Sequence, residues 1–395
     1  MKSWFNKNVL AIYITSLFSY QLQMAVVLLG SMYAWYPNLS ENVVLLMYSS
    51  PSFLAAAVSL AISPLMKKVN KKMLLVLGMC SILASGCLIV FTGGHSFPLA
   101  LTGAILTGIG YALIVSTTNT LLVENTPPSE SGKAIGINMA VGCLGVMFLT
   151  TVSGILAADG NWVRAYCLCF PTAISLVLFL LLYRQDRNAP VRSEPVSHEA
   201  ETAQSVQAAR SSSTGLFCGV LLLFLLMMLT ATAWNANFSS YVLENRIGTA
   251  ANSGMIATMS ALGGVIGGFF FTGFAIKYLK KLVVPICLLV VAAPCLAGAV
   301  GVRSMTLIYL CSFLFMLFFQ PAYSVFAATA GTLKPGPGVS IVNSVQGFGQ
   351  FLGPYVVTFV GGILGASLSG RFWSGVLFAV VAAVLAVPIM RRAQD

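Results

Sequence analysis

Residues 184–213, RQDRNAPVRSEPVSHEAETAQSVQAARSSS, form the longest polar stretch of the chain and divide it into two parts of nearly equal length. The stretch is rich in Ser, Ala, Glu and Pro and has almost no large apolar residues. Such a composition buries too little apolar surface to fold by itself. We therefore expect a flexible cytoplasmic linker here, between an N-terminal half at residues 1–183 and a C-terminal half at residues 214–395.

On both sides of this linker the sequence is too apolar for a water-soluble protein. Charged residues make up 8% of the 395 residues and hydrophobic residues 58%, with a mean hydropathy of +0.90. A soluble domain has about 25% charged residues, so we expect a polytopic helical protein in a lipid bilayer. The net charge of +11 would suggest nucleic acid in a soluble protein. Here the basic residues belong to loops, and we expect no nucleic-acid partner.

Six apolar runs in each half are long enough to cross a bilayer, which takes about 20 residues. Backbone groups in lipid must be hydrogen-bonded internally, so each run should be a helix. The sequence thus predicts an all-α membrane protein with twelve spans, at residues 9–34, 42–66, 73–92, 98–122, 134–157, 165–183, 215–240, 251–276, 283–301, 306–330, 339–363 and 372–390.

Lys and Arg are distributed unevenly between the two sides of these spans. If the N-terminus is cytoplasmic, 17 of the 21 Lys and Arg fall in cytoplasmic segments. The other four are Arg164, Arg246, Arg303 and Arg371. Because cytoplasmic loops carry the excess of basic residues, we expect both termini to be cytoplasmic.

The two halves also share short patterns. KKVNKK at 67–72 follows the second span, and KYLKK at 277–281 follows the eighth. Asn138 with Gly142 opens the fifth span, and Asn343 with Gly347 opens the eleventh at the same spacing. Similar halves around a linker predict an internal repeat.

With this layout the chain resembles the major facilitator superfamily of transporters over essentially its whole length. The loop after the second span sits where that family has a Gly-x-Leu-x-Asp-Arg-x-Gly-Arg-Lys pattern. The resemblance implies a cytoplasmic gate loop made by Lys67, Lys68, Lys71 and Lys72. Lys67 replaces the family's Asp, so the acidic gating contact of the family is not carried over.

Two further segments carry the resemblance. In the fourth span Gly108 and Gly110 fit the family, whereas Ala104 stands where many proton-coupled members have Arg. In the eleventh span Gly349 and Gly353-Pro354 resemble the Gly-x-x-x-Gly-Pro motif that antiporters carry in span five. The resemblance implies two pseudo-symmetric six-helix halves, transport by alternating access and a chain that works as a monomer in a bacterial inner membrane.

The twelve predicted spans contain no full charge. Charge in a span costs about 2.5–3.5 kcal/mol on insertion scales and is usually retained for function. A site for phosphate or dicarboxylate would use Arg or Lys, and a proton relay would use Asp, Glu or His. The sequence therefore favours a neutral or amphipathic small-molecule substrate and facilitative transport. Carboxylates at the span ends, Glu41, Glu124 and Glu244, keep a proton-coupled antiporter or drug efflux pump open as an alternative.

Neutral polar side chains do occur within the spans, and the resemblance implies that spans one, four, seven and ten line a central cavity. Amides there can hydrogen-bond a neutral ligand, although they can equally join helices to one another. The candidate substrate-binding residues are Gln21, Gln23, Asn119, Trp234, Asn235, Asn237, Gln320, Tyr323, Gln346 and Gln350.

Glycines and cysteines are interpreted as packing residues. Small residues four apart allow helices to approach closely, and this pattern covers Gly263, Gly264, Gly267, Gly268, Gly349, Gly353 and Pro354. The nine cysteines lie in apolar runs, so we expect no metal site and no cofactor. The sequence shows no cluster of reactive side chains of the kind that would indicate an enzyme. Export is favoured over uptake by the antiporter-like motif, and a non-transporting membrane receptor remains a further alternative.

Overall fold

The computed structural model describes residues 6–66, 69–126, 128–183, 210–279, 282–334, 337–365 and 367–394, and these are almost entirely helical. The first part of the chain forms α1 (Lys7–Leu17), η2 (Gln21–Gln23), α2 (Met24–Trp35), α3 (Glu41–Val44), α4 (Leu46–Met66), α5 (Lys71–Phe91), α6 (Phe97–Asn125), α7 (Pro128–Leu156), η3 (Trp162–Cys169) and α8 (Thr172–Leu182). The second part forms α9 (Arg210–Asn235), α10 (Phe238–Glu244), α11 (Ala250–Ile266), the π-helical turn η4 (Gly267–Phe271), α12 (Thr272–Leu279), α13 (Val283–Val291), α14 (Ala293–Ala299), α15 (Met305–Leu333), α16 (Pro337–Leu364) and α17 (Leu368–Gln394).

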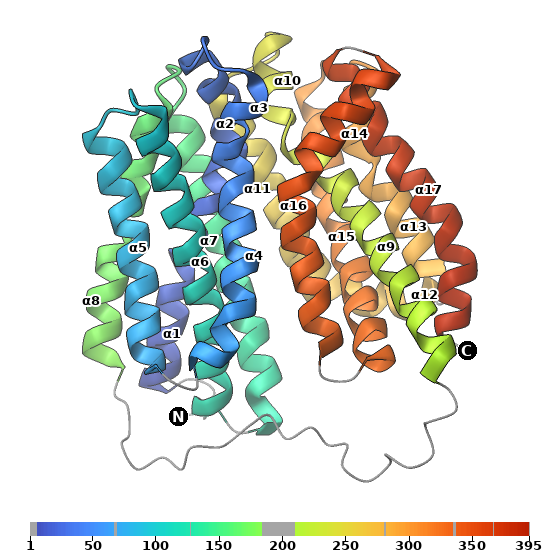
Figure 1. The fold of residues 1–395 in the computed structure, drawn as a ribbon, viewed down its shortest axis with the longest axis horizontal. Helices are drawn as coiled ribbons and strands as arrows, with labels where there is room; N and C mark the ends of the chain where they lie inside the picture. Colours follow the sequence, from blue (N-terminus) through green and yellow to red (C-terminus); the bar gives the residue numbers. More distant parts are fainter. Residues whose placement is uncertain are drawn as a thin grey trace.

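Helices from the two parts of the chain form two bundles that lie side by side (Figure 1). Both termini lie at the same end of the molecule, which we call the terminus side; the opposite end is the far side. The bundles lean together at the far side and spread apart toward the terminus side (Figure 1). The helices α10 and α11 pack on α2 and α7 of the other bundle, and α16 packs on α4.

Each of the twelve predicted spans coincides with a helical stretch. Ten stretches are long and apolar enough to cross a membrane, and the shorter apolar stretches Ala140–Leu156 and Val283–Ala299 match the fifth and ninth spans. Residues 184–209 of the expected linker lie outside the described part of the chain. The division of the chain at this linker therefore stays a prediction.

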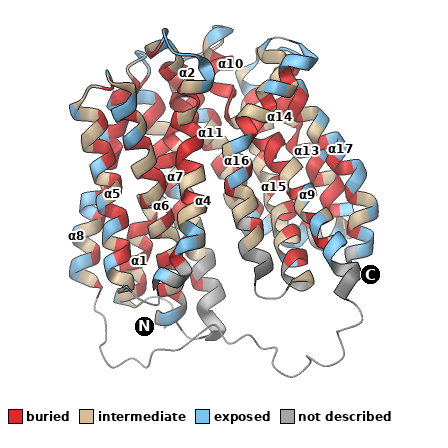
Figure 2. Cartoon of the chain, in the orientation of Figure 1, coloured by how far each residue is buried: buried red, intermediate tan, exposed pale blue. Residues whose placement is uncertain are grey.

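The outer surface of the bundles is apolar. Phe91, Phe270 and Phe359 have relative exposures of 82%, 75% and 72%. Buried residues follow the inside of each bundle, while intermediate and exposed residues face outward (Figure 2). Water-soluble proteins rarely expose such extensive apolar surface, whereas lipid tails solvate it. The surface therefore fits a protein surrounded by lipid.

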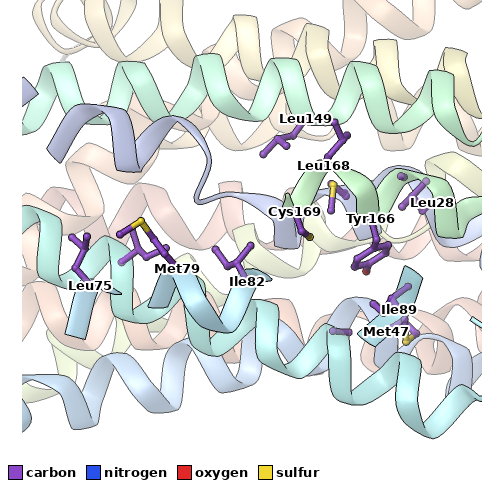
Figure 3. Packing of buried hydrophobic residues seen from close by; sticks show 14 of the residues in the cluster. Leu28, Met47, Leu75, Met79, Ile82, Ile89, Leu149, Tyr166, Leu168 and Cys169 are labelled. Carbon is purple, nitrogen blue, oxygen red and sulfur yellow. The ribbon is translucent and has the colours of Figure 1, made fainter. Parts of the chain in front are cut away.

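Each bundle has its own buried core. In the first, Met79 and Ile82 of α5 belong to the same cluster as Leu149 of α7 and Cys169 of η3 (Figure 3). In the second, a separate cluster joins α9, α13, α15 and α17. A third cluster contains residues of both bundles, including Val27 and Trp234. The bundles thus pack as units and share an apolar contact between them.

The first span is a broken helix, not the continuous helix that the sequence predicted. Helix α1 ends at Leu17, and a short 3₁₀ turn precedes α2. Close contact with α7 occurs at the break, because a Cβ added to Gly145 would lie 2.0 Å from the carbonyl oxygen of Leu17. The freed carbonyl of Phe18 accepts hydrogen bonds from Gln21 Nε2 at 2.8 Å and Thr172 Oγ1 at 3.3 Å. These side chains replace the lost helical partners.

Two kinds of contact join the bundles. Along α7 and α11, a Cβ on Gly154 would lie 2.5 Å from Ala250 O and 3.0 Å from Gly254 Cα. One turn toward the terminus side, Thr258 Oγ1 hydrogen-bonds with Thr151 Oγ1. We call this contact, formed by Thr150, Thr151, Gly154, Ala250, Gly254 and Thr258, the seam.

At the far side, the ends of the helices are joined by polar side chains. Arg371 of α17 forms an ion pair with Glu41 of α3. Just inside this pair, Ser49 Oγ of α4 lies 3.0 Å from the hydroxyl of Tyr355 of α16. We call the polar contact of Glu41, Asn237 and Arg371 the rim.

Candidate functional site

A cluster of tyrosines lies where the two bundles meet in the interior. The rings of Tyr20 and Tyr111 make an edge-to-face contact at 5.2 Å between centroids. Tyr111 in α6 also lies near Tyr323 of α15, in the other bundle. Gly142 of α7 packs against this cluster, because a Cβ added to Gly142 would lie 2.6 Å from the ring of Tyr20. The cluster therefore connects α6, α7 and α15 with the break in the first span.

The tyrosine rings supply both apolar faces and hydroxyl groups. Tyr323 also approaches Phe224 at 5.7 Å and Phe319 at 6.3 Å between ring centroids, so its ring has an apolar environment on its own bundle. Aromatic rings of this kind stack on flat or amphipathic molecules while their hydroxyls donate and accept hydrogen bonds. Of the three tyrosines, the sequence prediction included only Tyr323.

Asn119 lies on the same helix as Tyr111, two turns further along. Its Oδ1 is 3.5 Å from Nδ2 of Asn138 in α7. Asn138 is buried, and its own Oδ1 has no hydrogen-bond partner in the structure. A buried amide oxygen without a partner costs about 1–3 kcal/mol, so the position suits a donor supplied by a ligand or by water.

Gln21 is buried in the N-terminal bundle. Its Nε2 bonds to the carbonyl of Phe18 and, at 2.9 Å, to Oγ1 of Thr172 in α8. The amide therefore ties the broken first span to α8, and its Oε1 has no partner. Gln23 follows in the same turn and is half-buried.

The candidate residues of the seventh span lie toward the far side. Trp234 is fully buried between Phe238 and Phe372, and its indole nitrogen has no partner. Asn235 is half-buried. Asn237 donates to the carbonyl of Ala233 at 2.9 Å and accepts from Arg371 at 3.4 Å. Trp234 thus belongs to a packed core, and Asn237 belongs to the rim.

The remaining candidates come from α15 and α16. Gln320 is half-buried and lies one turn before Tyr323, with its Nε2 3.6 Å from the Cβ position of Gly264. Gln346 and Gln350 are half-buried on α16. The structure therefore brings Gln320 and Tyr323 to one stretch of helix, and leaves the amides of α16 on a separate one.

Helix contacts at the predicted packing glycines are uneven. A Cβ on Gly263 would lie 2.1 Å from Phe313 O, and one on Gly267 would lie 2.8 Å from Leu317 O. By contrast, nothing lies within 4 Å of the corresponding position on Gly268. In the eleventh span, Gly349 and Gly353 face α9 at 2.7 and 2.8 Å, and Pro354 is buried.

The basic loop after the second span is only partly described. Lys67 and Lys68 lie outside the described residues. Lys71 forms an ion pair with Glu124 of α6, in the same bundle. Lys72 is half-buried, and its backbone N–H bonds to the Asn70 side chain that caps α5. A gating role for this loop stays a prediction.

Charged side chains among the described residues lie near helix ends or in loops. The same residues hold no group of three or more His, Cys, Asp or Glu that could bind a metal ion. The interior thus offers a ligand aromatic rings, amides and hydroxyls.

Sequence comparison identifies the protein family. The model of the Major Facilitator Superfamily matches residues 9–250, more than half of the chain. The chain belongs to the Major Facilitator Superfamily. Members of this family are membrane transporters with twelve helices and are not enzymes, as the sequence predicted.

Curated relatives within the family are distant. The minor myo-inositol transporter IolF of Bacillus subtilis is 24% identical over 238 residues, 56% of this chain and 51% of the relative. The multidrug transporter mfsC of Aspergillus fumigatus is 29% identical over 193 residues, 45% of this chain and 36% of the relative. The matched part thus spans about half or less of each relative.

Solved structures match almost the whole fold. A bacterial homologue of the lysosomal transporter Spinster has a TM-score of 0.69 at 15% identity and covers 97% of this chain and 96% of its own. A peptide transporter gives 0.79 at 14% identity, covering 98% and 95%. The D-xylose–proton symporter gives 0.71 at 14% identity, covering 96% and 95%. These likenesses show the transporter fold.

Sequence reasoning missed Tyr20 and Tyr111 as site residues. Aromatic residues are common in apolar spans, and residue type alone does not indicate a site. The signals were positional: Tyr20 directly precedes Gln21 near the middle of a span, and Tyr111 directly follows Gly110. Their relation to Tyr323 depends on how the two bundles meet.

Proposed function

We propose that this member of the superfamily carries a small neutral or amphipathic organic solute across a bacterial inner membrane by alternating access, as a single chain. The observation that carries the proposal is the charge-free interior around Tyr20, Tyr111 and Tyr323, where aromatic and amide groups are available and ionic partners are not. A relative named for the neutral polyol myo-inositol supports a neutral solute, and one named for multidrug transport supports an amphipathic one.

Facilitative transport is the favoured mode, with export favoured over uptake. No interior group can load a proton near neutral pH, because carboxylates, His and Lys are absent from the middle of the described spans. The antiporter-like Gly349–Pro354 segment favours export. The terminus side is assigned to the cytoplasm from the excess of Lys and Arg there. In this orientation the seam and the rim close the outer side, which corresponds to an inward-facing state.

The alternative is proton-coupled antiport through carboxylates at the helix ends. It is supported by Glu41, which already takes part in a contact between the bundles. A non-transporting receptor is a further alternative, and solute-dependent flux would exclude it.

The experiment has two steps. A thermal-shift screen of the purified protein against neutral metabolites and drugs identifies a ligand, since a ligand at 100 times its dissociation constant adds about 2.7 kcal/mol of stability. Flux of that ligand into proteoliposomes is then measured with and without an imposed pH gradient. We expect equilibration without accumulation, and a loss of flux in Tyr111→Ala and Tyr323→Ala. Accumulation that Glu41→Gln abolishes would show the antiport mechanism instead.

A further inference from the structure

The rim holds an ion pair between the two bundles. The described residues form three ion pairs, Lys71–Glu124, Arg164–Asp159 and Arg371–Glu41. The first two join residues of the same bundle. Only the third joins residues of opposite bundles, and its partners are 330 positions apart in the chain.

Arg371 also has a polar partner and a nearby carboxylate within its own bundle. Its Nη1 lies 3.4 Å from Oδ1 of Asn237, at the break between α9 and α10. Glu244, at the end of α10, lies near both Arg371 and Glu41 but forms no ion pair with Arg371 in this state. Tyr33 of α2 lines the same pocket as Glu41, Asn237 and Arg371. Two carboxylates, one from each bundle, thus lie near one guanidinium, and Glu41 is the one that pairs with it here.

This arrangement is asymmetric in a way that suits a reversible contact. If the bundles separate at the far side, Arg371 keeps Asn237 and can turn to the nearby Glu244, both of which belong to its own bundle. Glu41 is left to water, and its side chain is already 58% exposed, compared with 21% for Arg371. Neither charge is then buried without a partner, which would be the costly outcome. A pair this exposed shifts a conformational equilibrium by up to about fivefold and cannot lock it.

We propose that Glu41, Asn237 and Arg371 form an outer gate in which Arg371 exchanges between Glu41 of the opposite bundle and Glu244 of its own. Pairing with Glu41 favours the state closed at the far side. Pairing with Glu244 favours the open state. This proposal deepens the proposed alternating access and rests on it for its role in transport, although the conformational equilibrium itself can be measured without any solute.

The test uses Ser49→Cys as a reporter. Ser49 is fully buried and faces Tyr355 across the bundles just inside the rim, so opening of the far side exposes it. The rate of labelling by a membrane-impermeant maleimide is measured in intact cells, and the parent chain with its native cysteines gives the background. Glu41→Gln and Arg371→Gln should each raise this rate by up to about fivefold. Glu244→Gln should lower it, because the competing partner is removed.

Matched controls separate the gate from a general effect of surface charge. Arg164→Gln breaks a far-side ion pair of the same kind within one bundle and should leave the rate unchanged. The double variant Glu41→Gln/Arg371→Gln should label no faster than the faster single variant, since the two residues act through one contact. Any of three results would overturn the proposal. The labelling rate could be the same in Glu41→Gln and the parent, the effects of the two single variants could multiply in the double variant, or the rate could rise in Glu244→Gln.

Flux measurements distinguish this failure from that of the transport proposal. If labelling changes as expected while no solute crosses proteoliposomes, the outer gate stands and the transport proposal fails. If a solute crosses but labelling is the same in all variants, transport stands and the gate proposal fails.

Discussion

The seam and the rim join the same two bundles with different chemistry. At the seam, Gly154 brings α7 within van der Waals contact of the backbone of α11, and hydroxyl groups are the only polar side chains involved. At the rim, side chains of opposite charge meet in a partly exposed site. Backbone contact depends steeply on distance, whereas an exposed ion pair weakens gradually and finds water as a substitute. The seam therefore fixes how closely the bundles approach, and the rim adjusts how often they separate.

The clearest change is predicted for labelling experiments that report the side of the membrane on which the rim lies. Single cysteines at His95 and Gly160, in far-side loops, should react with an impermeant reagent added to intact cells. Cysteines at Val69 and Ala200 should react only after the cells are opened. This all-or-none pattern follows from the excess of Lys and Arg on the terminus side. Labelling of position 200 from outside would reverse the assignment of the rim to the outer face.

A large effect is expected from added volume at the seam. In Gly154→Ala the new methyl would lie 2.5 Å from Ala250 O, so the bundles must move apart. Overpacking costs about 1–3 kcal/mol, which predicts a rise of about 5- to 150-fold in the labelling of a cysteine at position 49. Gly268→Ala is the control, because that position has free space around it. Similar rates for both variants would contradict the structural role of the seam.

A medium effect is expected from Thr258→Val. The substitution keeps the shape of the side chain and removes the hydroxyl that contacts Thr150 and Thr151 of the other bundle. A hydrogen bond is worth about 0.5–1.5 kcal/mol, so the same labelling rate should rise about two- to tenfold. Thr102→Val serves for comparison, since its hydroxyl bonds only within α6, to Pro98 O at 2.8 Å. An unchanged rate in Thr258→Val would mean that the backbone contact alone closes the seam.

The smallest effect is expected from ionic strength, which should weaken the rim and leave the seam unchanged. Raising the ionic strength from 0.1 to 1 M shortens the Debye length from about 10 to about 3 Å, which weakens partly exposed charges. Labelling of position 49 in the parent protein should therefore rise by about twofold or less. In Glu41→Gln the salt dependence should disappear. The same salt dependence in both proteins would show that the rim charges do not contribute.

Much of the fold could be predicted because its signals are local. Twelve apolar runs predicted twelve spans, and the helices found at residues 71–91, 97–125 and 305–333 begin and end within a few residues of the expected limits. The candidate site was predictable only in part. Tyr323 and Gln320 lie on one stretch of α15 as expected. Trp234 and Asn237, from an equally polar sequence, lie in a packed core and at the rim.

The amino-acid sequence alone predicted the membrane class, the number of spans and the absence of charge within them. These properties follow from the cost of exposing polar groups to lipid, which every residue bears individually. Three features became visible only in the folded molecule: the first span breaks at Phe18, Tyr111 lies near Tyr323, and Arg371 pairs with Glu41. Each of these depends on the relative position of helices distant in the chain. Hydrophobic periodicity shows which residues enter the membrane, and it carries no information about which of them will then meet.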